Sequence, residues 1–208
     1  MSPEMRFVIG PIPKSETFDA RVAGWTPLPS KSAREFALTA FLLALPLIAV
    51  AVVVFLASRA EVKVAFRASP LLAATFITGM LALVPIHEFV HALAYFKSPL
   101  SRYLIVGAWP QHGMFYALYD GPLPRARVLL MVAAPFLLLT AAPLFMIALG
   151  VLTPPPAVRA MLLFAALNHA ALCVGDSIVL WRIMRNVPRS ALIHNDGWIT
   201  YWARSRPE

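Results

Sequence analysis

Long apolar blocks dominate the chain, and short polar segments separate them. Four blocks are apparent, at residues 36–57, 68–96, 128–152 and 160–181. The second is interrupted by polar residues from His87, and the fourth contains one charged residue, Asp176. Each block reaches the roughly 20 residues that a helix needs to span a bilayer. We therefore expect an all-α integral membrane protein with four transmembrane helices, at about residues 35–58, 69–96, 124–152 and 157–182.

The residues at the ends of the blocks support these boundaries. Ser32 and Glu35 have the spacing of a capping box before the first block. Pro70 stands near the first helical position of the second block, where proline is favoured. Three consecutive prolines, residues 154–156, force a turn before the fourth block. The pattern thus divides the chain into a tail, a transmembrane domain and a second tail, at residues 1–34, 35–185 and 186–208.

The segment between the second and third blocks is more apolar than an ordinary loop. Two runs rich in aromatic residues, 103–109 and 114–119, flank the sequence Pro110–Gly113. This is the pattern of a β-hairpin. We expect a short membrane-associated hairpin over residues 102–122, shielded by protein from the hydrocarbon. The alternative is an irregular interfacial loop anchored by its aromatic side chains, with His112 as a turn residue.

Composition narrows the class of protein. Hydrophobic residues make up 60% of the chain and charged residues 13%, against about 45–50% and 25% in soluble domains. This excludes a water-soluble globule and a disordered chain. The net charge is +8, but the basic residues flank apolar blocks, which indicates a lipid bilayer rather than nucleic acid as partner. The single cysteine, Cys173, excludes an intrachain disulfide framework and a multi-cysteine zinc site.

The 18 Lys and Arg residues are distributed unevenly between the two sides that four spans define. The N-terminal tail carries 5, the segment between the second and third spans 4, and the residues from Arg182 onward 5, so one side has 14. The other side has 4, namely Arg59, Lys63, Arg67 and Arg159. The positive-inside rule predicts a multi-pass protein of the cytoplasmic membrane with both termini in the cytosol.

The interruption of the second block is an HExxH motif, with His87, Glu88 and His91 inside a predicted helix. Histidines four residues apart project from one face of a helix and can bind one metal ion. Glu88 is offset from them, where its carboxylate can reach a water rather than the metal. A chance HExxH is expected roughly 0.01 times or less in a chain of this composition. Polar residues in a membrane helix are functional by default, and the alternative is hydrogen-bonded helix packing.

Asp176 is the expected third ligand, because catalytic zinc sites combine three protein ligands with an open position. It is the only acidic residue besides Glu88 inside the four apolar blocks. At 1.5 Å per residue, Asp176 and the two histidines lie at similar depths, roughly 9–12 Å inside the cytosolic ends of their helices. The alternative is an ion pair between Asp176 and Arg182 or Arg185.

Three further polar side chains lie close to Asp176 in the sequence. His169 is two helical turns deeper, so it is either an alternative ligand or, as its depth favours, a hydrogen-bonding residue of the helix bundle. Asn168 either orients a substrate or bonds to another helix. Cys173 can bind a metal, but its small size favours a packing role.

The motif and the later aspartate together resemble the intramembrane zinc metallopeptidases of the site-2 protease family. In that family a later helix carries Asn-x-x-Pro-x-x-x-x-Asp-Gly. Asn168 and Asp176 have this spacing of eight, with Ala171 and Ser177 in place of the proline and the glycine. The chain is more similar still to small bacterial four-span zincin membrane peptidases, on the dipeptides Gly24-Trp25 and Gly175-Asp176. Ala134-Pro135 is an imperfect counterpart of the Gly-Pro pair of the site-2 proteases.

The resemblance implies a zinc-dependent protease in a bacterial membrane, with a membrane protein or peptide as substrate. His87, His91 and Asp176 would hold Zn²⁺, and Glu88 would act as the catalytic base. Two other functions use the same residues: a non-catalytic metal-binding scaffold, and a membrane zinc hydrolase acting on a lipid or lipidated peptide. The retention of Glu88 favours an enzyme, since a metal-binding scaffold does not need it. A transporter has little support without an internal repeat.

Overall fold

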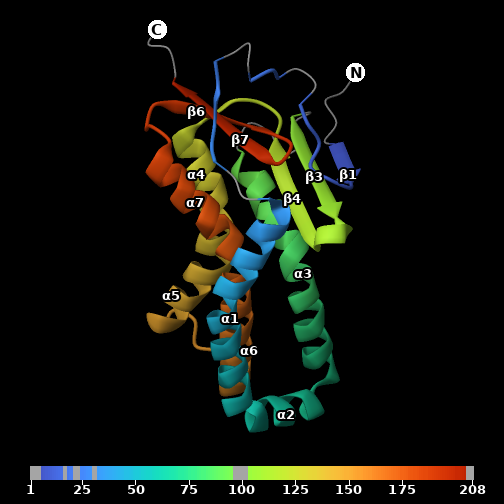
Figure 1. Ribbon diagram of the computed structural model, residues 1–208. Coiled ribbons are helices and arrows are strands. Elements are labelled where there is room, and N and C mark those ends of the chain that lie inside the picture. The colour runs from blue at the N-terminus through green and yellow to red at the C-terminus, as the bar shows by residue number, and fades with distance from the viewer. Residues whose placement is uncertain (1–5, 16–17, 21–23, 30–31, 96–102, 205–208) are drawn as a thin grey trace. The chain divides into compact units, whose positions relative to one another are not determined.

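The computed structural model, drawn in Figure 1, describes residues 6–15, 18–20, 24–29, 32–95 and 103–204. About 63% of the described residues are helical and 17% are in strands, which form two sheets with seven strands. The all-α prediction is therefore wrong, because polar and aromatic segments outside the apolar blocks pair as strands. The expected end of the second helix at Phe96 and the first residue of the expected hairpin, Arg102, lie outside the described residues.

Three helical segments are long and apolar enough to cross a membrane, which indicates a membrane protein. They are α1 (Ala33–Ala57), α3 (Pro70–Ala94) and the run Arg125–Ala148. That run consists of α4 (Arg125–Pro135), the π-helix η2 (Phe136–Ala141) and α5 (Ala142–Ala148). Large apolar side chains on the spans are exposed, such as Leu71 at 76% and Leu81 at 75%, as expected for helices that face lipid.

The prediction of a fourth straight span is wrong. Its place is taken by α6 (Pro156–Leu172) and α7 (Val174–Asn186), which satisfy the length and apolarity required of a span only as a pair bent by 47°. The break lies at Cys173, whose ψ of 0° leaves the helical region. Gly175 follows closely, and glycine is a poor helix former.

The predicted helix starts are confirmed at two places. Glu35 Oε2 accepts a hydrogen bond from Ser32 N at 3.0 Å, and Ser32 Oγ accepts one from Glu35 N at 3.3 Å. These reciprocal bonds form the capping box at the start of α1. Helix α3 begins at Pro70, as the sequence predicts.

The chain forms two compact units. The first comprises residues 1–38, 88–134 and 175–208 and contains both sheets. The second comprises residues 39–87 and 135–174. It contains α2 (Arg59–Ala68), η2, α5, α6 and most of α1 and α3.

The smaller sheet of the first unit has the strand order β1-β3-β4. Strand β1 (Arg6–Ile9) is parallel to β3 (Leu104–Trp109), which pairs antiparallel with β4 (Met114–Tyr119). A short 3₁₀ turn, η1 (Pro110–His112), joins β3 to β4 and ends at Gly113 with a φ of +60°. The predicted hairpin is confirmed over these residues, and Ile105, Tyr116 and Leu118 form a buried cluster on it.

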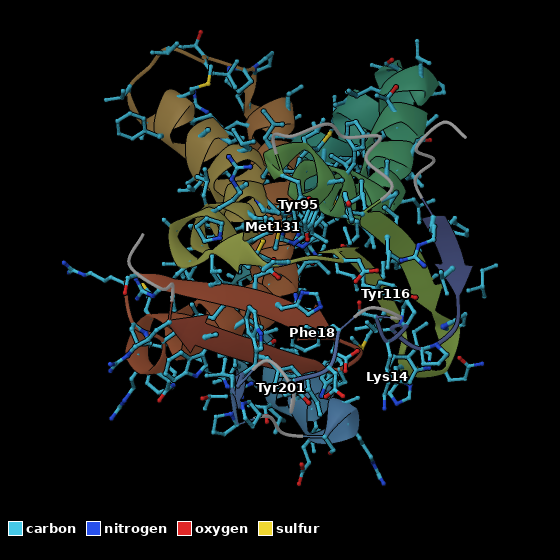
Figure 2. The ribbon with its side chains drawn as sticks, turned by 90° about the horizontal axis from the view of Figure 1, so that it is seen from above. Lys14, Phe18, Tyr95, Tyr116, Met131 and Tyr201 are labelled. Carbon is cyan, nitrogen blue, oxygen red and sulfur yellow. The ribbon has the colours of Figure 1, made fainter. Side chains whose placement is uncertain are left out.

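The second sheet of this unit has the order β2-β7-β6-β5 and is antiparallel. Its strands are β2 (Thr26–Pro27), β7 (Ile199–Arg204), β6 (Ala191–Asp196) and β5 (Leu123–Pro124). His194 of β6 is 4% exposed and stacks on Phe18, with ring centroids 3.9 Å apart. Phe18 also contacts Tyr201, and both are labelled in Figure 2. Burial lowers the pKa of His194, although Asp120 and Asp196 oppose the shift.

The second unit is built on helix packing. Val62 of α2 is buried against Ala160 and Met161 of α6. Phenylalanines from α1, α2 and α3 pack beside this cluster, and the ring centroid of Phe55 in α1 lies 4.9 Å from that of Phe164 in α6. Figure 1 shows α2 crossing between the ends of α1 and α3.

Candidate metal centre

The buried face of α3 carries both histidines of the HExxH motif. His87 and His91 lie one turn apart on this uninterrupted helix and are 5% and 6% exposed. Ile86 and Phe89, on the opposite side, are 42% and 58% exposed. Glu88 is half-buried between the two faces. The amphipathic pattern of this part of α3 therefore turns its polar residues inward, as in a membrane helix with a functional site.

In the first unit, His91 lies between a carbonyl oxygen and a carboxylate. Its Nδ1 is 2.9 Å from the Met131 carbonyl oxygen, and its Nε2 is 3.3 Å from Asp176 Oδ2. A carbonyl only accepts, so Nδ1 carries the hydrogen and donates it. In the neutral ring Nε2 then has a lone pair that faces a carboxylate oxygen. The nitrogen lone pair and the carboxylate oxygen repel each other at this distance, so the arrangement is favourable only when a positive charge lies between them.

The distance between these atoms fits one zinc ion. Ligands about 2.0–2.2 Å from a tetrahedral zinc lie roughly 3.4 Å from one another. The separation of His91 Nε2 and Asp176 Oδ2 is 3.3 Å. Imidazole nitrogen and carboxylate oxygen are both usual zinc ligands. The donor atoms of this pair therefore fit zinc in type and in spacing.

Pro135 explains why the Met131 carbonyl is available to His91. In an α-helix this carbonyl accepts from the amide four residues later, but position 135 is a proline and has no N–H. The helix then continues as the π-helix η2, in which Ala142 N bonds to Leu137 O, five residues before it. The proline of the Ala134-Pro135 pair thus leaves an acceptor at Met131, and His91 donates to it.

In the second unit, His87 begins a chain of hydrogen bonds. Its Nδ1 is 3.2 Å from His169 Nε2, and His169 Nδ1 is 2.8 Å from Thr140 Oγ1. The Thr140 hydroxyl donates to the Ala166 carbonyl at 3.4 Å, so it accepts from His169. His169 Nε2 then accepts from His87 Nδ1–H. This order leaves the lone pair of His87 on Nε2, the atom that most often binds a metal.

Cys173 gives the second unit another set of metal-binding atoms. Its sulfur is 3.8 Å from His87 Nδ1 and 3.9 Å from His169 Nε2. All three side chains are buried, and their donor atoms lie within 4.8 Å of one another. Two imidazoles and a thiol can hold zinc, so this set is an alternative to one that includes Asp176.

Asp176 lies in the first turn of α7, where the helix dipole favours a negative charge. Its Oδ2 lies 3.3 Å from His91 Nε2. The Arg185 guanidinium lies 5.2 Å from the Trp181 ring. The break before α7 therefore places the carboxylate at a helix N-terminus, whereas the sequence predicted it near the cytosolic end of a continuous span.

The structure also places Asn168 and His112, two other residues considered in the sequence analysis. Asn168 Nδ2 donates to the Phe164 carbonyl at 2.8 Å, within its own helix. His112 packs on Trp109 at the hairpin turn, with ring centroids 4.1 Å apart. His112 is thus a turn residue.

Tyr95 connects the motif with the sheet of the first unit. It directly follows the last residue of α3, and burial together with the negative charge of Glu88 raises its pKa. Its ring stacks on Tyr119 of β4 with centroids 5.3 Å apart, and its hydroxyl donates to the Ala117 carbonyl at 3.5 Å. Tyr95 and Met131 are labelled in Figure 2. Strand β4 therefore lies one helical turn beyond His91.

Comparison with known protein families matches residues 80–192 to the family described as "Putative zincin peptidase". The chain belongs to this family. The match covers more than half of the chain and includes the HExxH motif and Asp176. No curated protein and no solved structure matches the chain. Membership of the zincin peptidase family indicates a zinc metallopeptidase, and the three long apolar helices indicate that it is a membrane protein.

The sequence alone missed Met131, the partner of His91, and Thr140, the partner of His169. Each had a signal. Pro135 stands four residues after Met131, which marks a carbonyl without a helical partner. Thr140 is the only side chain of its span, Arg125–Ala148, that offers a hydroxyl. Its position in a π-helix is typical of functional sites in membrane and soluble proteins.

Proposed function

We propose that this zincin peptidase is an intramembrane endopeptidase of the site-2 protease type, which hydrolyses peptide bonds of membrane-embedded or membrane-proximal substrates. The observation that carries the proposal is the 3.3 Å separation of His91 Nε2 and Asp176 Oδ2, beside Glu88, on a helix apolar enough to cross a membrane. A water-soluble substrate does not need a site on such a helix.

In this proposal His87, His91 and Asp176 hold one zinc ion. His87 and His91 share one face of α3, and each ring bonds through Nδ1, which leaves Nε2 for the metal. Hydrogen-bonded partners of ligating histidines fix the tautomer and the ring orientation. His169 and the Met131 carbonyl supply these partners, so His169 is a positioning residue. Asn168 has no assigned role, since its amide bonds within its own helix.

Zinc, when bound, polarises the scissile carbonyl and makes water more acidic. Glu88 is the general base in this proposal: it accepts a proton from the attacking water and passes it to the leaving amine nitrogen. The position of Glu88 supports this role, because it is half-buried on α3 next to His87 and three residues before His91. The Tyr95 hydroxyl, whose pKa is raised, donates to the Ala117 carbonyl and so joins the end of α3 to β4.

The edge of β4 supports a peptide as the substrate. A helical peptide has its carbonyls in backbone hydrogen bonds and must unwind before attack. Among the described strands β4 is at the end of its sheet, paired with β3 on one side. An extended segment can add to such an edge through main-chain hydrogen bonds. Because Tyr95 contacts β4 one turn beyond His91, a segment bound there would pass close to the motif.

We also propose that both termini lie in the cytosol of a bacterium. Strand β1 pairs with β3, and β2 pairs with β7, so both terminal segments and the 103–119 hairpin belong to one unit. These segments share one membrane side and carry most of the basic residues. Reporter fusions at residue 208 and near Lys63 test the orientation. A reporter at residue 208 that is active outside the cytosol contradicts it.

Metal removal tests the proposed function directly. We expect one zinc per purified full-length chain, and cleavage of single-span membrane substrates that stops on chelation and returns with added zinc. Metal content is measured by mass spectrometry, and cleavage by gel shift of labelled substrates in lipid vesicles. Cleavage that continues at full rate after zinc is removed contradicts a metallopeptidase.

Pro135→Ala is expected to weaken zinc binding by about tenfold, within the roughly 10–100-fold range for losing a partner of a ligating histidine. Alanine supplies an amide hydrogen that competes with His91 for the Met131 carbonyl. Zinc affinity is measured by competition with a coloured chelator. Pro46→Ala, which changes a proline inside α1, is the matched control and should leave zinc affinity unchanged. Equal affinities of the two variants contradict the role of Pro135.

A further inference from the structure

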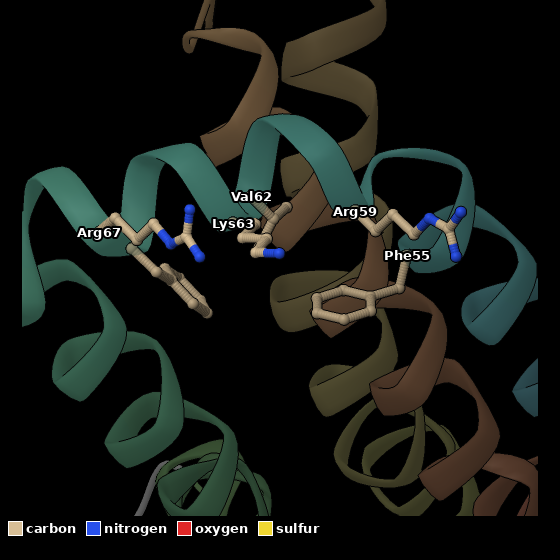
Figure 3. A pocket seen from close by; sticks show the side chains of 6 residues that line it. Phe55, Arg59, Val62, Lys63 and Arg67 are labelled. Carbon is tan, nitrogen blue, oxygen red and sulfur yellow. The ribbon is translucent and has the colours of Figure 1, made fainter.

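A hollow of about 440 Å³ lies along α2 in the second unit, away from the histidines. Figure 3 shows it close by, with the Phe55 ring and basic side chains of α2 around it. Its walls are mainly apolar in surface, although three of the six residues that line it are basic; the six are Phe55, Arg59, Val62, Lys63, Phe66 and Arg67. No step of the proposed hydrolysis uses these residues.

The basic and the apolar residues of α2 lie on two different faces of the helix. Arg59, Lys63 and Arg67 recur every four residues, so they follow one stripe of the helix, and all three are exposed. Val62 is buried and Phe66 half-buried on the neighbouring face. A cationic stripe beside an apolar face is the pattern of a helix that lies in a membrane interface.

The position of α2 fits this pattern. It joins α1 to α3, the two helices of 25 residues that are apolar enough to cross a membrane. A helix between the ends of two consecutive spans lies at a membrane surface. The hollow therefore opens where lipid headgroups meet acyl chains.

The charge of the second unit favours an anion. Residues 39–87 and 135–174 contain four basic residues, Arg59, Lys63, Arg67 and Arg159, and one acidic residue, Glu61. The net charge of this unit is therefore +3. Three of the four cations line the hollow, and Glu61 does not.

We propose that this hollow binds an anionic phospholipid of the membrane. The phosphate is held by Lys63 and Arg67 with Arg59 beside them, and an acyl chain packs on Phe55 and Phe66. The apolar wall favours a lipid over free phosphate, because a free anion gains nothing from contact with aromatic rings. Each cation close to an anionic headgroup contributes about fivefold to binding.

Native mass spectrometry of the purified full-length chain tests the proposal. Phosphatidylglycerol and phosphatidylcholine with identical acyl chains are added in separate titrations. We expect phosphatidylglycerol to be retained at least about tenfold more strongly. The double variant Lys63→Gln, Arg67→Gln should bind phosphatidylglycerol about 30-fold more weakly, the product of two cation contributions. Phe55→Ala should weaken retention of both lipids.

The matched control is the double variant Arg189→Gln, Arg204→Gln, which removes the same charge from exposed positions in the first unit. It should retain phosphatidylglycerol like the unchanged chain. A loss as large as that of the α2 variant shows a general charge effect and overturns the proposal. Glycerol 3-phosphate is the soluble competitor, and full displacement of the lipid by it overturns the role of the acyl chain. The experiment measures lipid binding alone, so its outcome does not depend on whether the chain is a protease.

Discussion

Glu88→Gln should abolish most peptide hydrolysis and leave the zinc content unchanged. Glutamine has nearly the same shape as glutamate but cannot accept the proton of the attacking water. General acid–base catalysis contributes typically about 10²–10⁴-fold to a rate, and we expect a loss of that size. Because Glu88 is offset from the face of His87 and His91, its replacement should leave the metal ligands in place. The measurement is cleavage of a panel of single-span substrates by both proteins at matched zinc occupancy.

Glu61→Gln is the matched control for this change. Glu61 is exposed on α2 and belongs to the other unit, so the same chemical change there should leave cleavage unaffected. Equal cleavage by the Glu88→Gln variant and the unchanged chain removes Glu88 from the mechanism. If neither protein cleaves any substrate of a broad panel while both hold zinc, a non-catalytic metal-binding scaffold becomes the better hypothesis. Cleavage of lipidated peptides alone favours a hydrolase of lipidated substrates.

Asp176→Asn should weaken zinc binding by more than the roughly 10–100-fold typical of residues around the ligands. The amide keeps the shape of the side chain but removes the negative charge that faces His91 Nε2. Activity should fall in proportion to zinc occupancy and return in part at high zinc. Asp196→Asn is the control, because Asp196 accepts a backbone hydrogen bond from Ser15 in the sheet and has no part in the proposed site.

Cys173→Ser distinguishes the two possible sets of ligands. If zinc is held by His87, His91 and Asp176, this variant binds zinc normally. The cobalt-substituted protein then has no sulfur-to-metal absorption band. If zinc is held by His87, His169 and Cys173, the serine variant loses the metal, and Asp176→Asn keeps it. Loss of zinc in Cys173→Ser with normal binding in Asp176→Asn would falsify the proposed ligand set.

The spans, the hairpin and the helix starts could be predicted because each depends on residues that are close together in the sequence. The capping box needs only Ser32 and Glu35, and the hairpin needs two apolar runs around a turn. The second sheet could not be predicted in this way. Strand β2 is two residues long, and its partner β7 lies at the other end of the chain. His194 likewise has no signal in the sequence, since its burial depends on Phe18, some 180 residues earlier.

In the candidate site, too, the features set by nearby residues could be predicted and those set by distant residues could not. The spacing of His87 and His91 follows from helical geometry, and Asp176 was selected because a lone carboxylate in a span needs a partner. Its pairing with His91 is a tertiary contact that no local pattern encodes. The break at Cys173 was missed because a bend between two apolar helices leaves the hydropathy of the block unchanged. The role of Pro135 was missed because its effect is exerted through the Met131 carbonyl, not through its own side chain.

The pairing of β2 with β7 also sets an order of events during synthesis. Pro27 pairs with Tyr201, so the ribosome must add a further 174 residues before this contact forms. At about 5–20 residues per second, β2 waits roughly 10–35 s. Strand β1, whose partner β3 begins at Leu104, waits roughly half as long. The sheet that pairs β2 with β7 therefore closes last, after the apolar helices have left the ribosome. A nascent chain that stalls before Ile199 would carry the whole HExxH helix and Asp176 without a closed sheet beside them.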